Sequence, residues 1–136
     1  MKKILSVTIC FVLSLTFGTL SLSYGETPGN CVTVAFHLVE AVTSVPVDCF
    51  RKPADQDLLI KKAGIVYSRV CYGLYADAMD KLTNDIWEKV DGCSEYGDFE
   101  ENDWIQDCRC QEDVYNSASD LLDCLRYLIY GLDCQE

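Results

Sequence analysis

The 136-residue sequence contains a single histidine, His37, and this scarcity limits the chemistry it can perform. Hydrolysis by an activated serine or cysteine normally needs a base beside the nucleophile, and no G-x-S-x-G motif accompanies His37. Leu38 follows it, where secreted phospholipase A2 has the aspartate of a His-Asp step. In the apolar stretch 34–39, a histidine is far more often packed and hydrogen-bonded than catalytic. A carboxylate pair acting as acid and base is the catalytic alternative, but no recognisable constellation supports it, so we predict no enzymatic activity, no catalytic residue and no cofactor.

Motifs for metal binding and glycosylation are also missing. The sequence has no C-x-x-C pair, and one histidine cannot supply the usual ligand spacing of a zinc site. No Asn-x-Ser/Thr sequon occurs, so N-glycosylation is not expected. We therefore predict no metal site of the common zinc type.

The first 25 residues have the pattern of a secretory signal peptide. Lys2 and Lys3 precede an apolar stretch over residues 4–22, and the segment ends in small residues that a signal peptidase accepts, with cleavage expected after Gly25. Polar residues interrupt the apolar stretch, and no second apolar run of about 20 residues follows, which disfavours a membrane anchor. Cys10 would be removed with the leader. We predict a secreted, extracellular protein with one domain over residues 26–136.

Cysteine is abundant in that predicted domain. An even number of cysteines in an oxidising compartment indicates four disulfide bridges, for which 105 pairings exist. Cys108 and Cys110 are too close to bridge each other without strain, so they are expected to reach different partners and to tie two other segments together. A redox-active C-x-C motif and a disulfide-linked dimer, in place of a monomer, are the alternatives. The eight predicted disulfide cysteines are Cys31, Cys49, Cys71, Cys93, Cys108, Cys110, Cys124 and Cys134.

The predicted mature chain is strongly acidic. Nine of the 11 basic residues remain beside 22 acidic ones, a net charge of −13 near neutral pH. Nucleic acid and anionic membranes need a basic surface, so neither is an expected partner, whereas a cationic receptor surface or bound cations fit better. The acidic side chains also favour solubility.

The acidic residues are densest over residues 95–107, which raises the question of calcium. Counted from Asp98, the sixth residue is Asp103, where an EF-hand loop needs glycine, and the twelfth is Arg109, where it needs glutamate. We therefore expect a solvated loop that carries a helix N-terminus.

Three segments have helical patterns. Residues 32–44 are apolar almost all round and end before Pro46, although their large residues also alternate as in a strand. Residues 53–92 repeat apolar residues every three or four positions and end at Gly92, with a capping box at Asp85 as a point where the helix could divide. Asp103 is expected to cap a short helix over 104–108, followed by a long helix over 113–132. The prediction is an all-α, disulfide-stapled bundle of three to four helices.

These features favour a protein that acts by binding. A rigid scaffold loses little entropy on binding, and exposed tyrosines could anchor it on a protein target such as a receptor or ion channel, as in a venom toxin or a signalling protein. The alternative is an extracellular carrier of a small hydrophobic ligand or lipid, enclosed by apolar helices. The tyrosines considered as anchors are Tyr67, Tyr72, Tyr75, Tyr115, Tyr127 and Tyr130.

Overall fold

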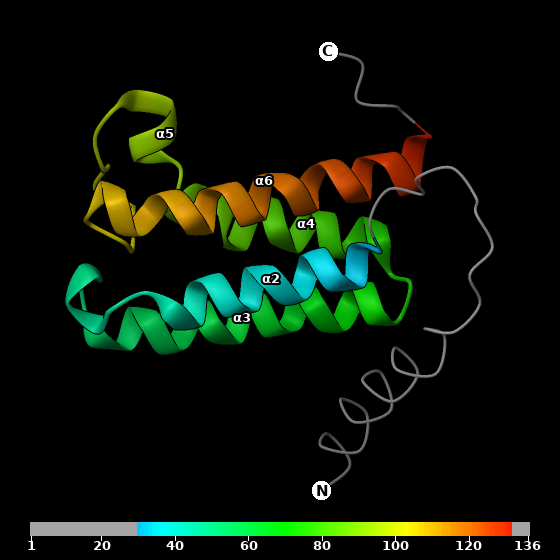
Figure 1. Ribbon diagram of the computed structural model, residues 1–136, viewed down its shortest axis with the longest axis horizontal. Coiled ribbons are helices and arrows are strands. Elements are labelled where there is room, and N and C mark those ends of the chain that lie inside the picture. The colour runs from blue at the N-terminus through cyan, green and yellow to red at the C-terminus, as the bar shows by residue number, and fades with distance from the viewer. Residues whose placement is uncertain (1–29, 132–136) are drawn as a thin grey trace, which may run out of the picture.

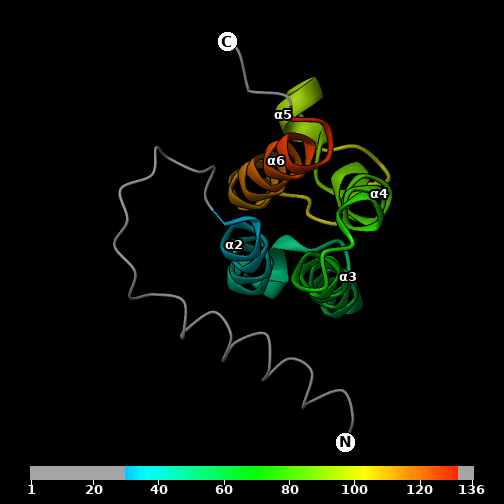
Figure 2. The ribbon, with the colours of Figure 1, turned by 90° about the vertical axis from the view of Figure 1, so that its right-hand side faces the viewer.

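Four long helices form an up-and-down bundle in the computed structural model, which describes residues 30–131 (Figure 1). The end-on view in Figure 2 shows them arranged as a ring, in which α2 packs between α3 and α6, and α4 completes the ring on the far side. The predicted leader and Cys134 lie outside the described residues. The prediction of an all-α, disulfide-stapled bundle is confirmed. The elements are α2 (Cys31–Ser44), η1 (Val47–Cys49), α3 (Pro53–Cys71), α4 (Tyr75–Asp85), η2 (Trp87–Lys89), α5 (Gly92–Tyr96) and α6 (Cys108–Tyr130).

Helix α2 confirms the helical interpretation of residues 32–44 over the strand alternative. Its N-terminus is capped by Asn30, whose Oδ1 accepts a hydrogen bond from the Val32 amide at 3.1 Å. Ala35, Leu38 and Val42 are fully buried, and their spacing of three and four residues places them on one face. The helix stops before Pro46, which cannot continue it.

The single long helix predicted over residues 53–92 is wrong, because the chain reverses at Gly73. This glycine has a φ of +72°, a left-handed conformation that ends α3 and lets α4 return antiparallel to it. Helix α4 then ends at Asp85, close to the predicted point of division, and a short 3-10 turn, η2, follows it.

The prediction for the last helices is also wrong in its details. One continuous helix, α6, begins at Cys108, and its cap is Asp107, whose Oδ1 accepts from the amides of Arg109 (2.9 Å) and Cys110 (3.4 Å). No helix forms over residues 104–107. This segment instead runs beside the end of η1, where the Gln106 amide donates to the Cys49 carbonyl at 2.8 Å.

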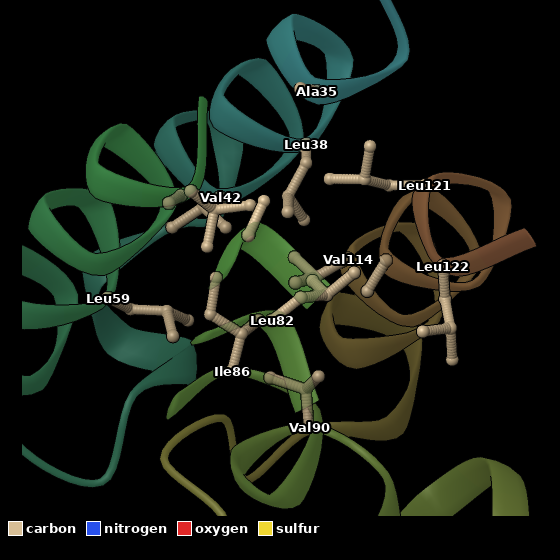
Figure 3. Packing of buried hydrophobic residues seen from close by; sticks show 14 of the residues in the cluster. Ala35, Leu38, Val42, Leu59, Leu82, Ile86, Val90, Val114, Leu121 and Leu122 are labelled. Carbon is tan, nitrogen blue, oxygen red and sulfur yellow. The ribbon is translucent and has the colours of Figure 1, made fainter. Parts of the chain in front are cut away.

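The core lies along the axis of the bundle. Figure 3 shows Leu38 of α2 and Leu121 of α6 pointing toward one another, with Leu82 of α4 and Leu59 of α3 on the other side of the core. All four are fully buried. Because each such side chain stabilises the fold by about 1.5–3 kcal/mol relative to an exposed one, the apolar core holds the bundle together along with its bridges.

Three disulfides join other segments to α6. Cys31–Cys124 links it to α2, Cys49–Cys110 links it to η1, and Cys93–Cys108 links it to α5. Cys71 is also disulfide-bonded. Cys108 and Cys110 therefore reach different partners, as their short separation predicts. The start of α6 is the point at which two separate segments are fixed to the bundle.

Candidate functional site

An acidic loop, defined here as residues 91–107, projects from one end of the bundle at the start of α6 (Figure 1). The Cys93–Cys108 bridge closes this loop over a separation of 15 residues. The loop contains no lysine or arginine. Its seven acidic residues are Asp91, Glu95, Asp98, Glu100, Glu101, Asp103 and Asp107.

A buried glutamine of α6, Gln111, anchors the acidic loop through hydrogen bonds. The Gln111 side chain donates to Asp103 Oδ2 and to the Ile105 carbonyl, each at 3.1 Å, and its Oε1 accepts from the Cys93 amide at 2.8 Å. Asp103 Oδ2 also accepts from the Glu100 amide at 2.8 Å. Asp103 is fully buried in this network, so its predicted role as the cap of a short helix is wrong. Buried, hydrogen-bonded contacts of this kind give the loop a defined conformation.

Gly92 allows the loop to pack this closely. The sequence predicts that it ends a helix, but it begins α5. A Cβ atom at this position would overlap Asp103 Oδ2 and would lie 2.8 Å from the Glu100 nitrogen and 2.9 Å from the Asp98 carbonyl oxygen. Only glycine fits here, because two of these three atoms belong to the backbone.

The outer surface of the loop exposes two aromatic side chains. Tyr96 is 67% exposed and Phe99 is 44% exposed. The negative charges of Glu100 and Glu95 raise the pKa of the Tyr96 hydroxyl above its ordinary value, which reports the local negative potential. The loop therefore combines apolar contact area with acidic charge.

The tyrosines that the sequence analysis considered are not part of this exposed surface, although Tyr115 lies near the base of the loop, where burial and the charges of Glu95 and Asp91 raise the pKa of its hydroxyl. Tyr72 and Tyr130 are exposed at the ends of α3 and α6, far from α5 (Figure 1). Tyr67 packs against Phe36, and Tyr115 packs against Trp87 with ring centroids 4.7 Å apart. Tyr96 and Phe99 were not considered, although the acidic residues and Gly97 around them indicate a surface turn.

A cleft of about 740 Å³ with both polar and apolar walls lies between α2 and α6, beside the same start of α6. Its walls include Glu40, Asp113 and Asp120, together with Arg109. His37 also lines it: the side chain is 62% exposed, and its Nδ1 lies 3.1 Å from Glu40 Oε2. His37 is hydrogen-bonded as expected, but the expectation that it is packed in an apolar environment is wrong.

Two carboxylate oxygens of the acidic loop are buried and lack a hydrogen-bond partner within the described chain. They are Asp91 Oδ1 and Asp103 Oδ1. Burial raises the pKa of the Asp91 carboxyl, and the charges of Glu95, Asp103 and Glu100 raise it further. Over residues 30–131, His, Cys, Asp and Glu side chains do not gather in groups of three or more that could hold a metal ion.

Comparison of the chain with protein-family models, curated proteins and solved structures found no match. None of the helices within residues 30–131 has the length and apolar character needed to span a membrane.

Proposed function

We propose that this is a secreted, non-enzymatic protein that binds an extracellular protein target, such as a receptor or an ion channel, through its acidic loop. The observation that carries the proposal is the exposure of Tyr96 and Phe99 on a loop that a disulfide and a buried network hold in place. A role as a venom component or as a signalling protein fits this mode of action.

The fixed conformation of the loop lowers the cost of binding. Each side chain or loop that must be ordered on association reduces the affinity, and this loop is already ordered by Cys93–Cys108 and by Gln111. Aromatic side chains are frequent among the few residues that dominate binding energy. Tyr96 and Phe99 are therefore the expected anchors.

The charge of the loop selects the kind of target. Seven carboxylates without a basic residue favour a partner whose contact surface is rich in lysine or arginine. Such charges mainly accelerate association and make it sensitive to salt. A protein target with a basic surface is the partner that this arrangement fits best.

The test is binding of the labelled protein to an array of purified extracellular domains of receptors and channels. The Tyr96→Ala/Phe99→Ala double variant should bind its target at least about tenfold more weakly, since each residue lost from the centre of an interface costs about 1 kcal/mol or more. The matched control is Tyr72→Ala/Tyr130→Ala, which removes two exposed tyrosines at the opposite end of the bundle. An equal loss in both double variants would contradict recognition by the loop.

The cleft between α2 and α6 favours carriage of a small ligand as a second candidate function. Its carboxylates together with its apolar walls suit a small ligand that carries a positive charge on an apolar body, in place of the purely hydrophobic one expected from the sequence. Native mass spectrometry of the protein purified from its natural secretion tests this, because a small bound mass lost on denaturation would identify a carrier. A Glu40→Gln/Asp120→Asn variant should then lose that mass.

A further inference from the structure

The cleft between α2 and α6 lies between two antiparallel helices whose ends are fixed to each other. The Cys31–Cys124 bridge joins the start of α2 to the later part of α6, and the Cys49–Cys110 bridge joins the segment after α2 to the start of α6. The two helices pack side by side between these bridges (Figures 1 and 2). The walls of the cleft are thus held in place before any ligand arrives, which lowers the cost of binding.

Small side chains leave room in this cleft. Ala41 and Ser44 line it from α2, and Ser117 lines it from α6. Val45 and Cys110 add apolar area toward one end, where Val45 is buried. The cleft therefore suits a narrow ligand with an apolar body that lies between the two helices.

Three carboxylates follow one another along the cleft. Asp113 and Asp120 are two turns apart on α6, about 10 Å along the helix axis. The Cys31–Cys124 bridge gives both helices a common starting point. At about 1.5 Å per residue, Asp120 lies about 6 Å from this bridge, Glu40 about 13.5 Å and Asp113 about 16.5 Å. Glu40 is therefore placed between the two aspartates, on the opposite wall.

The two aspartates at the ends of this row have no positive partner in the described part of the chain. Among residues 30–131, neither Asp113 nor Asp120 forms an ion pair within 4.0 Å. Arg109 lines one end of the cleft, but its guanidinium lies 3.5 Å from Asp107 Oδ2, and Asp107 is not part of the cleft wall. Both aspartates are therefore available to positive charges on a ligand.

We propose that the cleft binds a linear aliphatic diamine or polyamine that lies along the two helices. Its terminal ammonium groups pair with Asp113 and Asp120, its methylene chain lies against Ala41 and Val45, and a central amine faces Glu40. Because both aspartates are exposed, each ion pair is weak and sensitive to salt, so affinity depends on reaching both at once. This inference rests on the second candidate function, carriage of a small ligand, and is independent of recognition by the acidic loop.

The test is isothermal calorimetry of the disulfide-intact protein with three probes, at neutral pH and low salt. Octamethylenediamine is long enough to reach both aspartates, trimethylenediamine carries the same charge on a chain that is too short, and octylamine has the long chain with a single charge. We expect one octamethylenediamine per chain, bound at least about fivefold more tightly than either other probe. The reason is that only this probe can form both ion pairs while its chain contacts the apolar wall.

Two double variants locate the binding site. Asp113→Asn/Asp120→Asn should weaken the binding of octamethylenediamine at least about fivefold, because both ion pairs are lost. The matched control is Glu100→Gln/Glu101→Gln, which removes the same charge from exposed positions of the acidic loop and should change the affinity less than about twofold. Circular dichroism checks that both variants are folded.

Several results would overturn the proposal. Equal affinity for the two diamines, or equal losses in the two double variants, would show only a diffuse attraction of cations to the acidic surface. Octylamine that binds as tightly as octamethylenediamine would mean that the apolar wall alone holds the ligand. The proposal also fails if octamethylenediamine does not bind up to about 10 mM, a concentration that detects even weak exposed ion pairs. A small mass still found on the natural protein by native mass spectrometry would then support carriage of a different ligand, which separates the two failures.

Discussion

Replacing Gly92 with alanine tests the packing of the acidic loop most directly. The new methyl group would overlap Asp103 Oδ2 and would press on the Glu100 nitrogen and the Asp98 carbonyl oxygen. Overpacking of this kind costs about 1–3 kcal/mol. If the Asp103 carboxylate moves away, its hydrogen bonds to the Glu100 amide and to Gln111 are lost too, at about 1.5–3 kcal/mol for bonds to a charged group.

One effect of the substitution opposes this loss. Alanine favours a helix over glycine by up to about 1 kcal/mol, and position 92 is the first residue of α5. Since the steric and hydrogen-bond losses together exceed this gain, we expect Gly92→Ala to lower the free energy of unfolding by about 2–4 kcal/mol.

Gly64→Ala is the matched control. Gly64 lies inside α3, and a Cβ atom there would have no neighbour within 4 Å. The same chemical change should therefore stabilise the protein by about 0.5–1 kcal/mol.

Urea unfolding of the disulfide-intact proteins, followed by far-ultraviolet circular dichroism, measures both variants. Gly92→Ala should shift the midpoint down by about 1 M or more, given a typical dependence of 1–3 kcal/mol per molar urea. If Gly92→Ala were as stable as the parent protein, or if the two alanine variants shifted in the same direction, the steric argument would be refuted.

Three further substitutions test other parts of the structure. Asp107→Ala should destabilise α6 because it removes the cap, whereas Asp107→Asn should be close to the parent protein in stability. Hydrogen bonds from backbone amides hold the pKa of Asp107 below its ordinary value, so the stability lost in Asp107→Ala should shrink as the pH falls below about 4 in urea titrations. Replacing Cys93 and Cys108 with alanine should lower the free energy of unfolding by about 3 kcal/mol and make chymotrypsin cleave the acidic loop faster. Equally fast cleavage in the parent protein would contradict the stabilising role of the bridge. Lys62→Met breaks the 2.8 Å ion pair with Asp85 between α3 and α4, and it should lower the free energy of unfolding by about 1 kcal/mol or less above pH 4. Because the hydrogen bond from Lys62 lowers the pKa of Asp85, this loss should vanish in stronger acid, and an unchanged loss at pH 2 would contradict the argument.

The helices could be predicted from the sequence because their apolar spacing is regular. Leu38 and Val42 in α2, and Leu121 and Leu125 in α6, repeat at the interval of a helical face and are fully buried. The reversal at Gly73 could not be separated from a continuous helix, because the apolar spacing continues on both sides of it. The chain reverses there because α3 and α4 bury their apolar faces against each other, a tertiary contact that the local sequence does not reveal.

The candidate site was harder to predict for a different reason. Asp103 has the sequence context of a helix cap, but Gln111, eight residues later, competes for its carboxylate and buries it. Contacts of this kind depend on where the Cys93–Cys108 bridge places the chain, and pairing cannot be read from spacing. The acidic character of the loop was visible in the sequence, whereas its anchoring and its exposed aromatic residues were not.

The convergence of the bridges on α6 has a consequence for biosynthesis. Each of the three bridges takes its second cysteine from residues 108–124, so none of them can close before the start of α6 has been made. At about 5–20 residues per second, the earlier cysteines wait several seconds as thiols beside unfinished helices. Any pair that forms among Cys31, Cys49 and Cys93 during that interval is non-native, and it has to exchange through a mixed disulfide before the native bridges close. The three bridges can therefore form only after α6 has been made and has packed against α2, η1 and α5.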